Sequence, residues 1–326
     1  MRAVQVSEFG GPEKLRLEDV PEPSLGEGEI VIRPTAVGLN FFDTLVLRNR
    51  YQITPSLPFS PGSEIAGEIE GLGPGVSGLR IGQRVVAFIG GNGCREKVTT
   101  KASNAISIPD GVSDKAAAGI PVTYGTALHA FKDRAQLKEG ESVAVLGAAG
   151  GAGVAAIEIT KLMGARVIAV ASSADKLAFA LAHGADEGVN YETEDLKGRL
   201  KELTGQKGVD VLYDPVGGDY AEPALRAMAW EGRYLVLGFA SGTIPRLPLN
   251  LVMLKGCAII GVFWTAFVER NPDAHRANME LLLDWCEEGL IAPHIHATFA
   301  LADTAKALSL IEERKVTGKV MVNPQA

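Results

Sequence analysis

The sequence predicts an α/β protein in which a β-rich domain is joined to a doubly wound domain built on a parallel sheet. Two observations lead to this prediction. Residues 1–122 contain short alternating segments separated by turn signals, as expected of a small barrel-like unit. From residue 123 onwards, continuous apolar strands alternate with helical stretches, which is the pattern of a buried parallel sheet. A chain of 326 residues also exceeds what one hydrophobic core usually holds.

The individual elements follow from these patterns. In the first domain we expect strands at 29–34, 65–71 and 84–89. In the second we expect strands at 142–146, 166–171, 188–190, 209–213, 234–238 and 258–262. The helices between these strands are expected at 153–163, 175–183, 192–203 and 220–230. Helical patterns at 274–289 and 302–314 precede a closing strand at 319–323. We therefore divide the chain into 1–122, 123–262 and 263–326, with the last part returning to the first domain.

Composition excludes several classes of partner. The net charge is −7 and no basic block is present, so a nucleic-acid partner is not expected. No apolar run reaches the ~18–20 residues of a membrane span. The N-terminal residues lack the basic and apolar regions of a secretory signal, which predicts a cytoplasmic protein. Cys94, Cys257 and Cys286 are far apart and lack metal-binding spacing, so neither a disulfide framework nor a structural zinc site is expected.

The strand at 142–146 is followed by a loop of small residues, Leu146-Gly147-Ala148-Ala149-Gly150-Gly151-Ala152-Gly153, which opens a helix. This is the context in which a glycine-rich loop binds a dinucleotide, because backbone N–H groups at the helix start face the pyrophosphate. Alanine stands at the first position of the G-x-G-x-x-G frame. The residues expected to contact the cofactor are Ala149, Gly150, Gly151, Ala152 and Gly153.

The end of the next strand bears on the choice of cofactor. NAD-binding sites place an acidic residue there, but 166–171 is followed by Ser172 and Ser173, with Lys176 in the next turn. Two hydroxyls and a lysine suit a 2′-phosphate, to which the hydroxyl of Tyr191 could add a contact. Asp175 is the rival candidate for the ribose, although an acid in a first helical turn also has a purely structural explanation. This pattern favours NADPH over NADH.

Several further motifs occur in a recognisable order: Phe9-Gly10-Gly11-Pro12-Glu13, Gly38-Leu39-Asn40-Phe41-Phe42-Asp43, Pro61-Gly62-Ser63-Glu64, Tyr213-Asp214-Pro215-Val216-Gly217-Gly218 and Thr317-Gly318-Lys319-Val320-Met321-Val322. With them the chain resembles the medium-chain dehydrogenase/reductase superfamily over essentially its whole length, and specifically the quinone oxidoreductase and zeta-crystallin branch. The resemblance implies a GroES-like first domain, a Rossmann second domain and an active site in the cleft between them. It also implies a homodimer, for which the apolar strand at 257–262 is the candidate edge.

Zinc dehydrogenases of this superfamily use metal ligands where the chain has Asn40, Ser63 and Val122. No metal is therefore expected, and no Lewis acid would polarise an alcohol or carbonyl. Reduction of an activated acceptor, such as a quinone or enone, is the expected reaction.

The resemblance also assigns individual residues. Asn40 and Thr126 match residues beside the nicotinamide, and Tyr51 matches a tyrosine near the substrate and is our candidate proton donor, with water as the alternative. Asp43 either orients the substrate or caps a turn. Lys319 lies where a basic residue approaches the cofactor phosphate. Other cofactor contacts are expected at the ends of strands, at Gly238, Phe239, Ala240, Phe263 and Trp264.

The sequence therefore predicts NADPH-dependent reduction of a quinone or another α,β-unsaturated carbonyl. Two alternatives remain open: a reductase of enoyl-thioesters such as acryloyl-CoA, and a nonenzymatic NADPH-binding protein.

Overall fold

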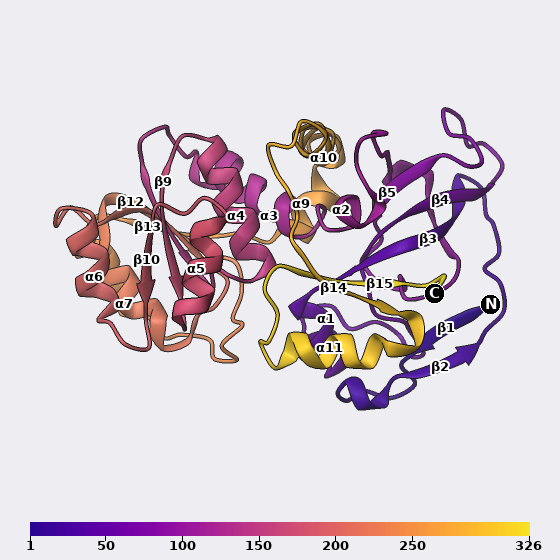
Figure 1. Cartoon of the computed structure of the whole chain (residues 1–326), viewed down its shortest axis with the longest axis horizontal. Helices are drawn as coiled ribbons and strands as arrows, with labels where there is room; N and C mark the ends of the chain where they lie inside the picture. Colours follow the sequence, from indigo (N-terminus) through magenta and orange to yellow (C-terminus); the bar gives the residue numbers. More distant parts are fainter. The chain divides into compact units, whose positions relative to one another are not determined.

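The computed structural model describes residues 1–326, which form two compact units. Unit 1 contains Met1–Val122 and Met279–Ala326, and unit 2 contains Thr123–Asn278. The chain therefore returns to unit 1 at Met279, later than the residue 263 expected from the sequence. Figure 1 shows both units in the colours of the sequence.

Unit 2 is built on a six-stranded parallel sheet in the order β10-β9-β8-β11-β12-β13. Its strands are β8 (Ser142–Leu146), β9 (Arg166–Ala171), β10 (Glu187–Asn190), β11 (Val209–Asp214), β12 (Met228–Val236) and β13 (Ala258–Gly261). Its helices are α3 (Thr123–Leu128), the π-helix η3 (His129–Ala135), α4 (Gly151–Leu162), α5 (Ala174–Ala182), α6 (Leu196–Leu203), η4 (Gly218–Tyr220), α7 (Ala221–Arg226), α8 (Leu249–Lys255) and α9 (Trp264–Arg270). Helices α4 and α5 cover one face of the sheet and α6 and α7 the other (Figure 1). This is the doubly wound plan that the sequence predicted.

Two expected helices differ at one end by four residues from those in the structure. The helix predicted at 192–203 begins only at Leu196, because the Asp195 side chain caps it by accepting a hydrogen bond from the Gly198 N–H at 3.1 Å. The helix predicted at 220–230 was wrong in its last part, since α7 ends at Arg226 and β12 begins at Met228. The start of β12 is irregular and contains Glu231 at a φ of 59°, so its side chains do not alternate as a regular strand would.

Unit 1 is β-rich, as expected. Its main sheet has the order β14-β15-β3-β4-β5-β7, with β6 also pairing with β3, while β1 and β2 form a separate pair. The strands are β1 (Arg2–Gln5), β2 (Arg16–Asp19), β3 (Glu29–Leu39), β4 (Glu64–Leu72), β5 (Arg84–Phe88), β6 (Val98–Lys101), β7 (Ala105–Ser107), β14 (Ile295–Ala300) and β15 (Lys319–Asn323). The helices are η1 (Pro12–Lys14), α1 (Phe41–Leu47), η2 (Ala102–Asn104), α2 (Asp114–Ala118), η5 (Leu301–Asp303) and α11 (Thr304–Glu312), and α10 (Pro272–Glu287) spans the second boundary.

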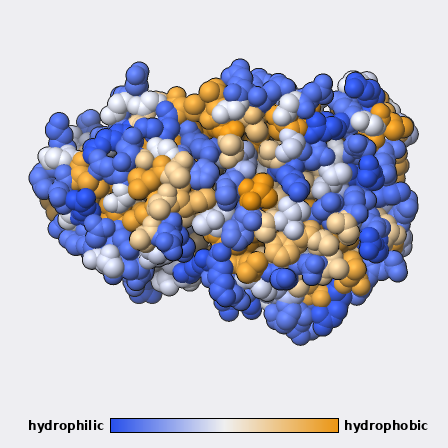
Figure 2. Space-filling model, viewed as in Figure 1, coloured by the Kyte–Doolittle hydropathy of each residue, from blue (hydrophilic) through white to orange (hydrophobic).

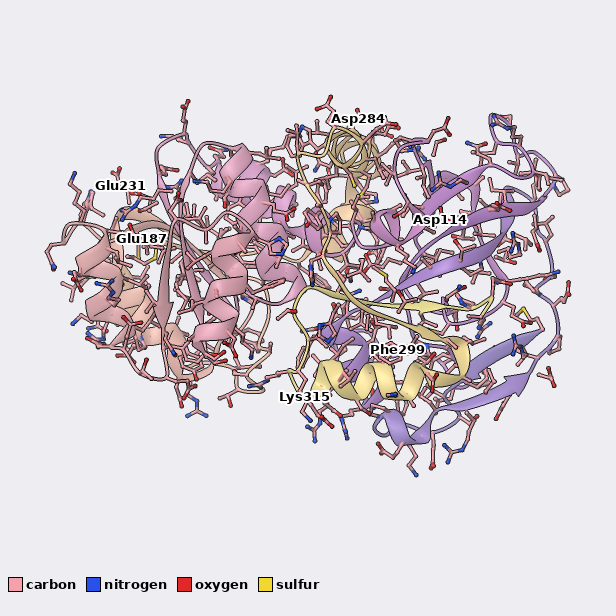
Figure 3. The ribbon with its side chains drawn as sticks, in the orientation of Figure 1. Asp114, Glu187, Glu231, Asp284, Phe299 and Lys315 are labelled. Carbon is pink, nitrogen blue, oxygen red and sulfur yellow. The ribbon has the colours of Figure 1, made fainter.

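Polar contacts join separate strands of unit 1. Asp114, at the start of α2, accepts hydrogen bonds from Thr35 of β3 at 2.5 Å and from Arg84 of β5 at 2.7 Å (Figure 3). The carboxylate thereby fixes α2 against two strands of the main sheet.

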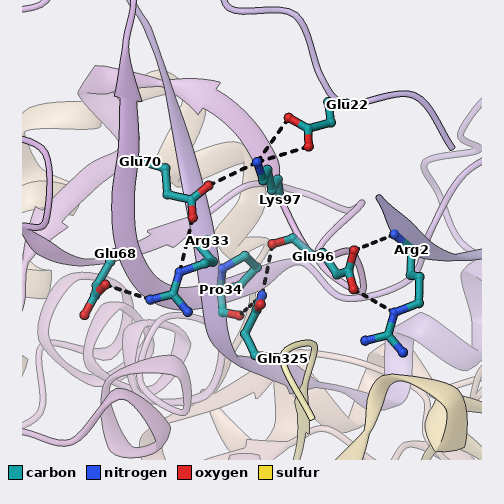
Figure 4. Close-up of polar contacts among 9 residues, drawn as sticks. All are labelled: Arg2, Glu22, Arg33, Pro34, Glu68, Glu70, Glu96, Lys97 and Gln325. Atoms are coloured by element: carbon teal, nitrogen blue, oxygen red, sulfur yellow. Dashed lines mark hydrogen bonds and ion pairs between the residues drawn. The ribbon is translucent and has the colours of Figure 1, made fainter. Parts of the chain in front are cut away.

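A second network lies nearer the surface of unit 1 (Figure 4). Glu70 of β4 forms ion pairs with Arg33 at 3.3 Å and with Lys97 at 3.5 Å, and the Gln325 amide donates to the Glu96 carbonyl at 3.0 Å. The Gln325 amide also donates to the Pro34 carbonyl of β3 at 3.0 Å, so this side chain ties the C-terminal segment to the sheet. The exposed ion pairs stabilise the fold only slightly.

The visible face of the molecule is mainly hydrophilic, with separate hydrophobic patches (Figure 2). None of the helices combines the length and the apolar character needed to cross a membrane.

Ring contacts explain why the chain stays in unit 2 beyond residue 263. A Cβ atom on Gly125 of α3 would lie only 2.9 Å from the Trp264 ring, so this glycine lets the indole pack against α3. Phe267 of α9 stacks on His129 with ring centroids 4.0 Å apart. Helix α9 therefore packs against α3 and η3 of unit 2, a relation that spacing along the sequence does not reveal.

His275 of α10 makes this packing sensitive to pH. Its ring lies edge-on to Trp264, 5.4 Å between centroids, and its Nδ1 is buried without a hydrogen-bond partner. Burial, aided by the positive charge of Arg276, lowers the pKa of His275 from 6.5 to about 4. The unfolded chain therefore binds the extra proton first as pH falls, so stability present above pH 6.5 is lost between pH 6.5 and about 4.

We expect His275→Phe to remove this contribution. Urea unfolding of both proteins at pH 7 and pH 5 checks it: the wild type should lose more stability on acidification than the variant. Equal losses in the two proteins would contradict the assignment.

Candidate active site

The loop of small residues has the geometry of an anion-binding helix start. Gly147, with a φ of 65°, turns the chain after β8, and α4 begins at Gly151 without a side-chain cap. A Cβ atom on Gly153 would lie 2.4 Å from the Gly147 carbonyl oxygen, so glycine alone permits this approach of α4 to the loop. The first N–H groups of α4 have no acceptor within the helix, which is the arrangement that binds phosphate groups.

The residues after β9 lie together as expected. The Ser173 side chain caps α5 by accepting from the Lys176 N–H at 3.3 Å, and the Lys176 ammonium donates to the Ser172 hydroxyl at 3.1 Å. Lys176 is half-buried, and Asp175 is exposed to solvent. The structure thus offers a cation and a hydroxyl at the end of β9, where an NAD site would offer a carboxylate.

Tyr191 borders the same strand end. Its N–H donates to the Ala171 carbonyl at 3.1 Å, and its ring lies 4.2 Å from that of Tyr220. Tyr220 in turn donates to Glu192 at 3.2 Å. The backbone of Tyr191 is therefore fixed beside the last residue of β9.

Asp214, the last residue of β11, is a functional candidate that the sequence analysis did not single out. Its buried carboxylate accepts from the N–H groups of Val216 and Gly217, both at 2.7 Å, and from the Tyr234 hydroxyl. Burial raises the pKa of Asp214. In the loop that Asp214 holds, the Pro215 carbonyl accepts a hydrogen bond from the Ala240 N–H at 3.0 Å.

Asp214 therefore supports the segment after β12 that contains Gly238, Phe239 and Ala240. The only sequence signal for this role was its place in the Tyr213–Gly218 motif.

In unit 1, the residues predicted for the substrate side form a buried polar cluster. The Asn40 amide donates from Nδ2 to Glu64 Oε1 at 2.8 Å. The Lys319 ammonium donates to the same Glu64 oxygen at 2.5 Å, to Asn40 Oδ1 at 2.7 Å and to the Leu39 carbonyl at 3.2 Å. The other Glu64 oxygen accepts from the Val122 N–H at 2.7 Å. We call Asn40, Glu64 and Lys319 the unit 1 cluster.

This geometry corrects the expected role of Lys319. The side chain is 3% exposed, and its three N–H donors are all engaged within unit 1. No donor is left for a cofactor phosphate.

The structure favours the capping alternative for Asp43. One oxygen accepts from the Asn40 N–H at 2.7 Å, and the other accepts from the Gly62 N–H at 3.2 Å. Burial raises the pKa of Asp43 to about 7, against the effect of these hydrogen bonds. The carboxyl group thus holds the start of α1 and with it the backbone of Asn40.

Comparison with known proteins decides the family. The model for the alcohol dehydrogenase GroES-like domain matches residues 26–131, and that for zinc-binding dehydrogenase matches residues 151–285. Quinone oxidoreductase-like protein 2 of Rattus norvegicus is 39% identical over 323 residues, which cover 99% of this chain and 92% of the relative. The chain belongs to the quinone oxidoreductase family of the medium-chain dehydrogenase/reductase superfamily.

Solved structures of quinone oxidoreductases agree with this assignment. A mycobacterial protein complexed with NADPH superposes with a TM-score of 0.93 at 32% identity, covering 99% of this chain and 100% of that one. The Escherichia coli quinone oxidoreductase complexed with NADPH gives a TM-score of 0.92 at 28% identity, with the same coverage. The GroES-like and Rossmann folds expected from the sequence are confirmed.

The match of residues 151–285 to the zinc-binding dehydrogenase domain does not by itself place zinc in this chain. Zinc prefers thiolate, imidazole and carboxylate ligands. At the positions where zinc dehydrogenases have metal ligands, this chain has the amide of Asn40, the hydroxyl of Ser63 and the hydrocarbon side chain of Val122. No three His, Cys, Asp or Glu side chains gather as a metal site anywhere in the chain. The residues present do not fit zinc.

The remaining residues expected from the quinone oxidoreductase resemblance lie as follows. Thr126 is half-buried on α3, next to Gly125, on which Trp264 packs. Phe263 is 49% exposed, while Trp264 is buried. Tyr51 follows α1 and stacks on Phe42, with ring centroids 5.3 Å apart.

Proposed function

We propose that this protein is an NADPH-dependent reductase that acts without zinc on a quinone or another α,β-unsaturated carbonyl. The observation that carries the proposal is the Ser172–Lys176 contact at the end of β9, beside the uncapped start of α4. A cation and a hydroxyl suit a 2′-phosphate, whereas a carboxylate at this place would repel it. The NADPH complexes of two relatives support the same choice.

In the proposed mechanism, the chain mainly binds and orients. Backbone N–H groups of Ala149–Gly153 hold the pyrophosphate, and Ser172, Lys176 and Tyr191 hold the 2′-phosphate. When bound, NADPH supplies a hydride to the acceptor and leaves as NADP⁺. A proton from the Tyr51 hydroxyl or from water completes the reduction of a quinone to the hydroquinone. Asn40 and Thr126 are the proposed contacts of the nicotinamide.

The side chains that replace the zinc ligands, at Asn40, Ser63 and Val122, indicate the class of acceptor. Without a Lewis acid, the alkoxide that reduction of an unactivated ketone would form lacks the stabilisation that a metal ion gives. A conjugated acceptor spreads the developing charge through its own π-system. Quinones and enones are therefore the proposed substrates.

The first experiment follows NADPH oxidation with benzoquinone, phenanthrenequinone, an enone and acryloyl-CoA, each repeated with NADH and with a chelator. Turnover of quinones that prefers NADPH and ignores the chelator is the expected result. Loss of activity with the chelator would contradict a zinc-free reaction. Turnover of acryloyl-CoA alone would instead identify an enoyl-thioester reductase, and NADPH binding without any turnover would indicate the nonenzymatic alternative.

Lys176→Ala should weaken the binding of NADPH much more than the binding of NADH. Loss of a charged hydrogen bond to phosphate costs about 1.5–3 kcal/mol, so NADPH should bind roughly 10- to 100-fold more weakly. NADH, which lacks the 2′-phosphate, should change little. Titration of coenzyme fluorescence measures both dissociation constants. Asp175→Asn is the matched control: a selective loss of NADH affinity in that variant would show that Asp175 binds the ribose and would count against the phosphate site.

We also propose a homodimer formed through the edge of the unit 2 sheet. Strand β13 is an edge strand, with Ile259 37% exposed, and the neighbouring Trp230, Leu249 and Met253 are each more than two-thirds exposed. An open edge beside apolar side chains is a surface suited to a second copy. Sedimentation should show a dimer of the 34.4 kDa chain and a monomer for Met253→Lys. A monomeric wild type would refute the proposal.

A cytoplasmic location is proposed from the cysteines. None of the three forms a disulfide, and Cys94 and Cys257 are buried. Free thiols are typical of a reducing compartment. Recovery of the native protein in an exported fraction would contradict this location.

A further inference from the structure

The pairing of β15 with β3 brings a cation from near the C-terminus next to Asn40. Val320 lies opposite Leu39 in the antiparallel register, so the preceding Lys319 reaches the residue that follows Leu39. The side chains of Lys319 and Glu64 are 3% and 0% exposed. The ammonium therefore lies in the interior of unit 1, with its charge balanced by a carboxylate 2.5 Å away.

These two charges determine the orientation of the Asn40 amide. An ammonium group has only hydrogens to offer, and a carboxylate has only lone pairs. The amide oxygen must therefore face Lys319 and the amide nitrogen must face Glu64, as the distances of 2.7 and 2.8 Å show. A flipped amide would lose both hydrogen bonds. The arrangement leaves one Nδ2 hydrogen of Asn40 that the unit 1 cluster does not use.

We propose that Lys319 and Glu64 are positioning residues that hold the Asn40 amide in one orientation, so that its second N–H is offered to the carbonyl oxygen of the acceptor or of the nicotinamide. Lys319 then supplies a buried positive charge next to Asn40, which stands where zinc dehydrogenases have a metal ligand. This inference rests on the proposed function, in which Asn40 lies beside the reacting groups.

Two other roles for Lys319 predict different results. If it contacted the cofactor phosphate, its loss would weaken NADPH binding. If it only stabilised the fold, its effect on turnover would be independent of Asn40.

The test compares Lys319→Met, Asn40→Ala and the double variant, measuring the NADPH dissociation constant and kcat with the best quinone. A misplaced group at a reacting centre costs about 100-fold in rate, so we expect kcat to fall by about that factor in each single variant. NADPH affinity should change by less than roughly threefold, a fraction of the loss expected for a charged contact. The double variant should be no slower than Asn40→Ala, and Lys319→Arg should restore part of the activity.

The proposal is overturned if Lys319→Met weakens NADPH binding with kcat unchanged, or if the two substitutions act independently on kcat. Should Lys319→Met fail to fold, Glu64→Gln/Lys319→Met leaves no charge unpaired, and the same loss of kcat is expected from it.

A readout without turnover separates this inference from the proposed function. The side-chain amide signal of Asn40 in an NMR spectrum is identified by its loss in Asn40→Ala. It should be protected from solvent exchange in the wild type and lose protection in Lys319→Met or in Glu64→Gln/Lys319→Met. Unchanged protection would overturn the positioning role, whether or not the wild type reduces any acceptor, whereas a wild type without turnover would refute only the proposed function.

Discussion

Replacing Glu64 with alanine is expected to lower the free energy of unfolding by about 3–5 kcal/mol, because a buried ammonium would lose its counter-charge. The same substitution removes the acceptors for the Asn40 amide and for the Val122 N–H. Urea unfolding at neutral pH measures the loss.

Glu68 provides a matched control on the same strand. Its carboxylate is 44% exposed and pairs with Arg33 at 2.8 Å, so Glu68→Ala should cost less than about 1 kcal/mol. The neutral pair in Glu64→Gln/Lys319→Met should recover most of the stability that Glu64→Ala loses. Equal costs for Glu64→Ala and Glu68→Ala would show that the buried pair does not contribute as described.

Gly153→Ala is expected to weaken NADPH binding by about 100-fold, because the added methyl group overlaps backbone atoms and forces α4 away from the loop. The Cβ atom would lie 2.4 Å from the Gly147 carbonyl oxygen and 2.6 Å from the Cα of Ala148. Neither atom can move without shifting the end of β8. Coenzyme titration and thermal unfolding together measure the effect.

Gly150→Ala is the comparison for this prediction. Its added methyl group would lie 3.5 Å from the nearest atom, the Gly147 oxygen, which is an ordinary contact. The thermal stability of Gly150→Ala should therefore stay near that of the wild type. Wild-type NADPH affinity in Gly153→Ala would contradict the close approach of α4 to the loop.

The sequence was most informative where structure is local. Continuous apolar runs between turn residues predicted β8, β9 and β15 at their observed bounds. A strand buried on both faces is apolar along its whole length, so its ends are easy to locate. The small residues of the phosphate loop were likewise recognisable, because their role depends on neighbours a few positions away.

The sequence was least informative where contacts cross the chain. Lys319 and Glu64 are 255 positions apart, and nothing near Lys319 in the sequence indicates that its charge is buried. Similarly, Trp264 stays in unit 2 because it packs on Gly125, a contact that periodicity does not reveal. Asp214 was visible as part of a motif, but its role depends on hydrogen bonds to a loop and to Tyr234.

The interruption of unit 1 by unit 2 has a consequence for synthesis on the ribosome. Unit 2 is one uninterrupted stretch, 123–278, so all of its strands emerge in a single series. The central strand β3 of unit 1 emerges early but gains its partner β15 only after unit 2 has been made. Until then Glu64 lacks the ammonium that balances it. The first segment of unit 1 therefore stays without β15 until the end of synthesis. The Asn40 amide gains its contact with Lys319 only after that point.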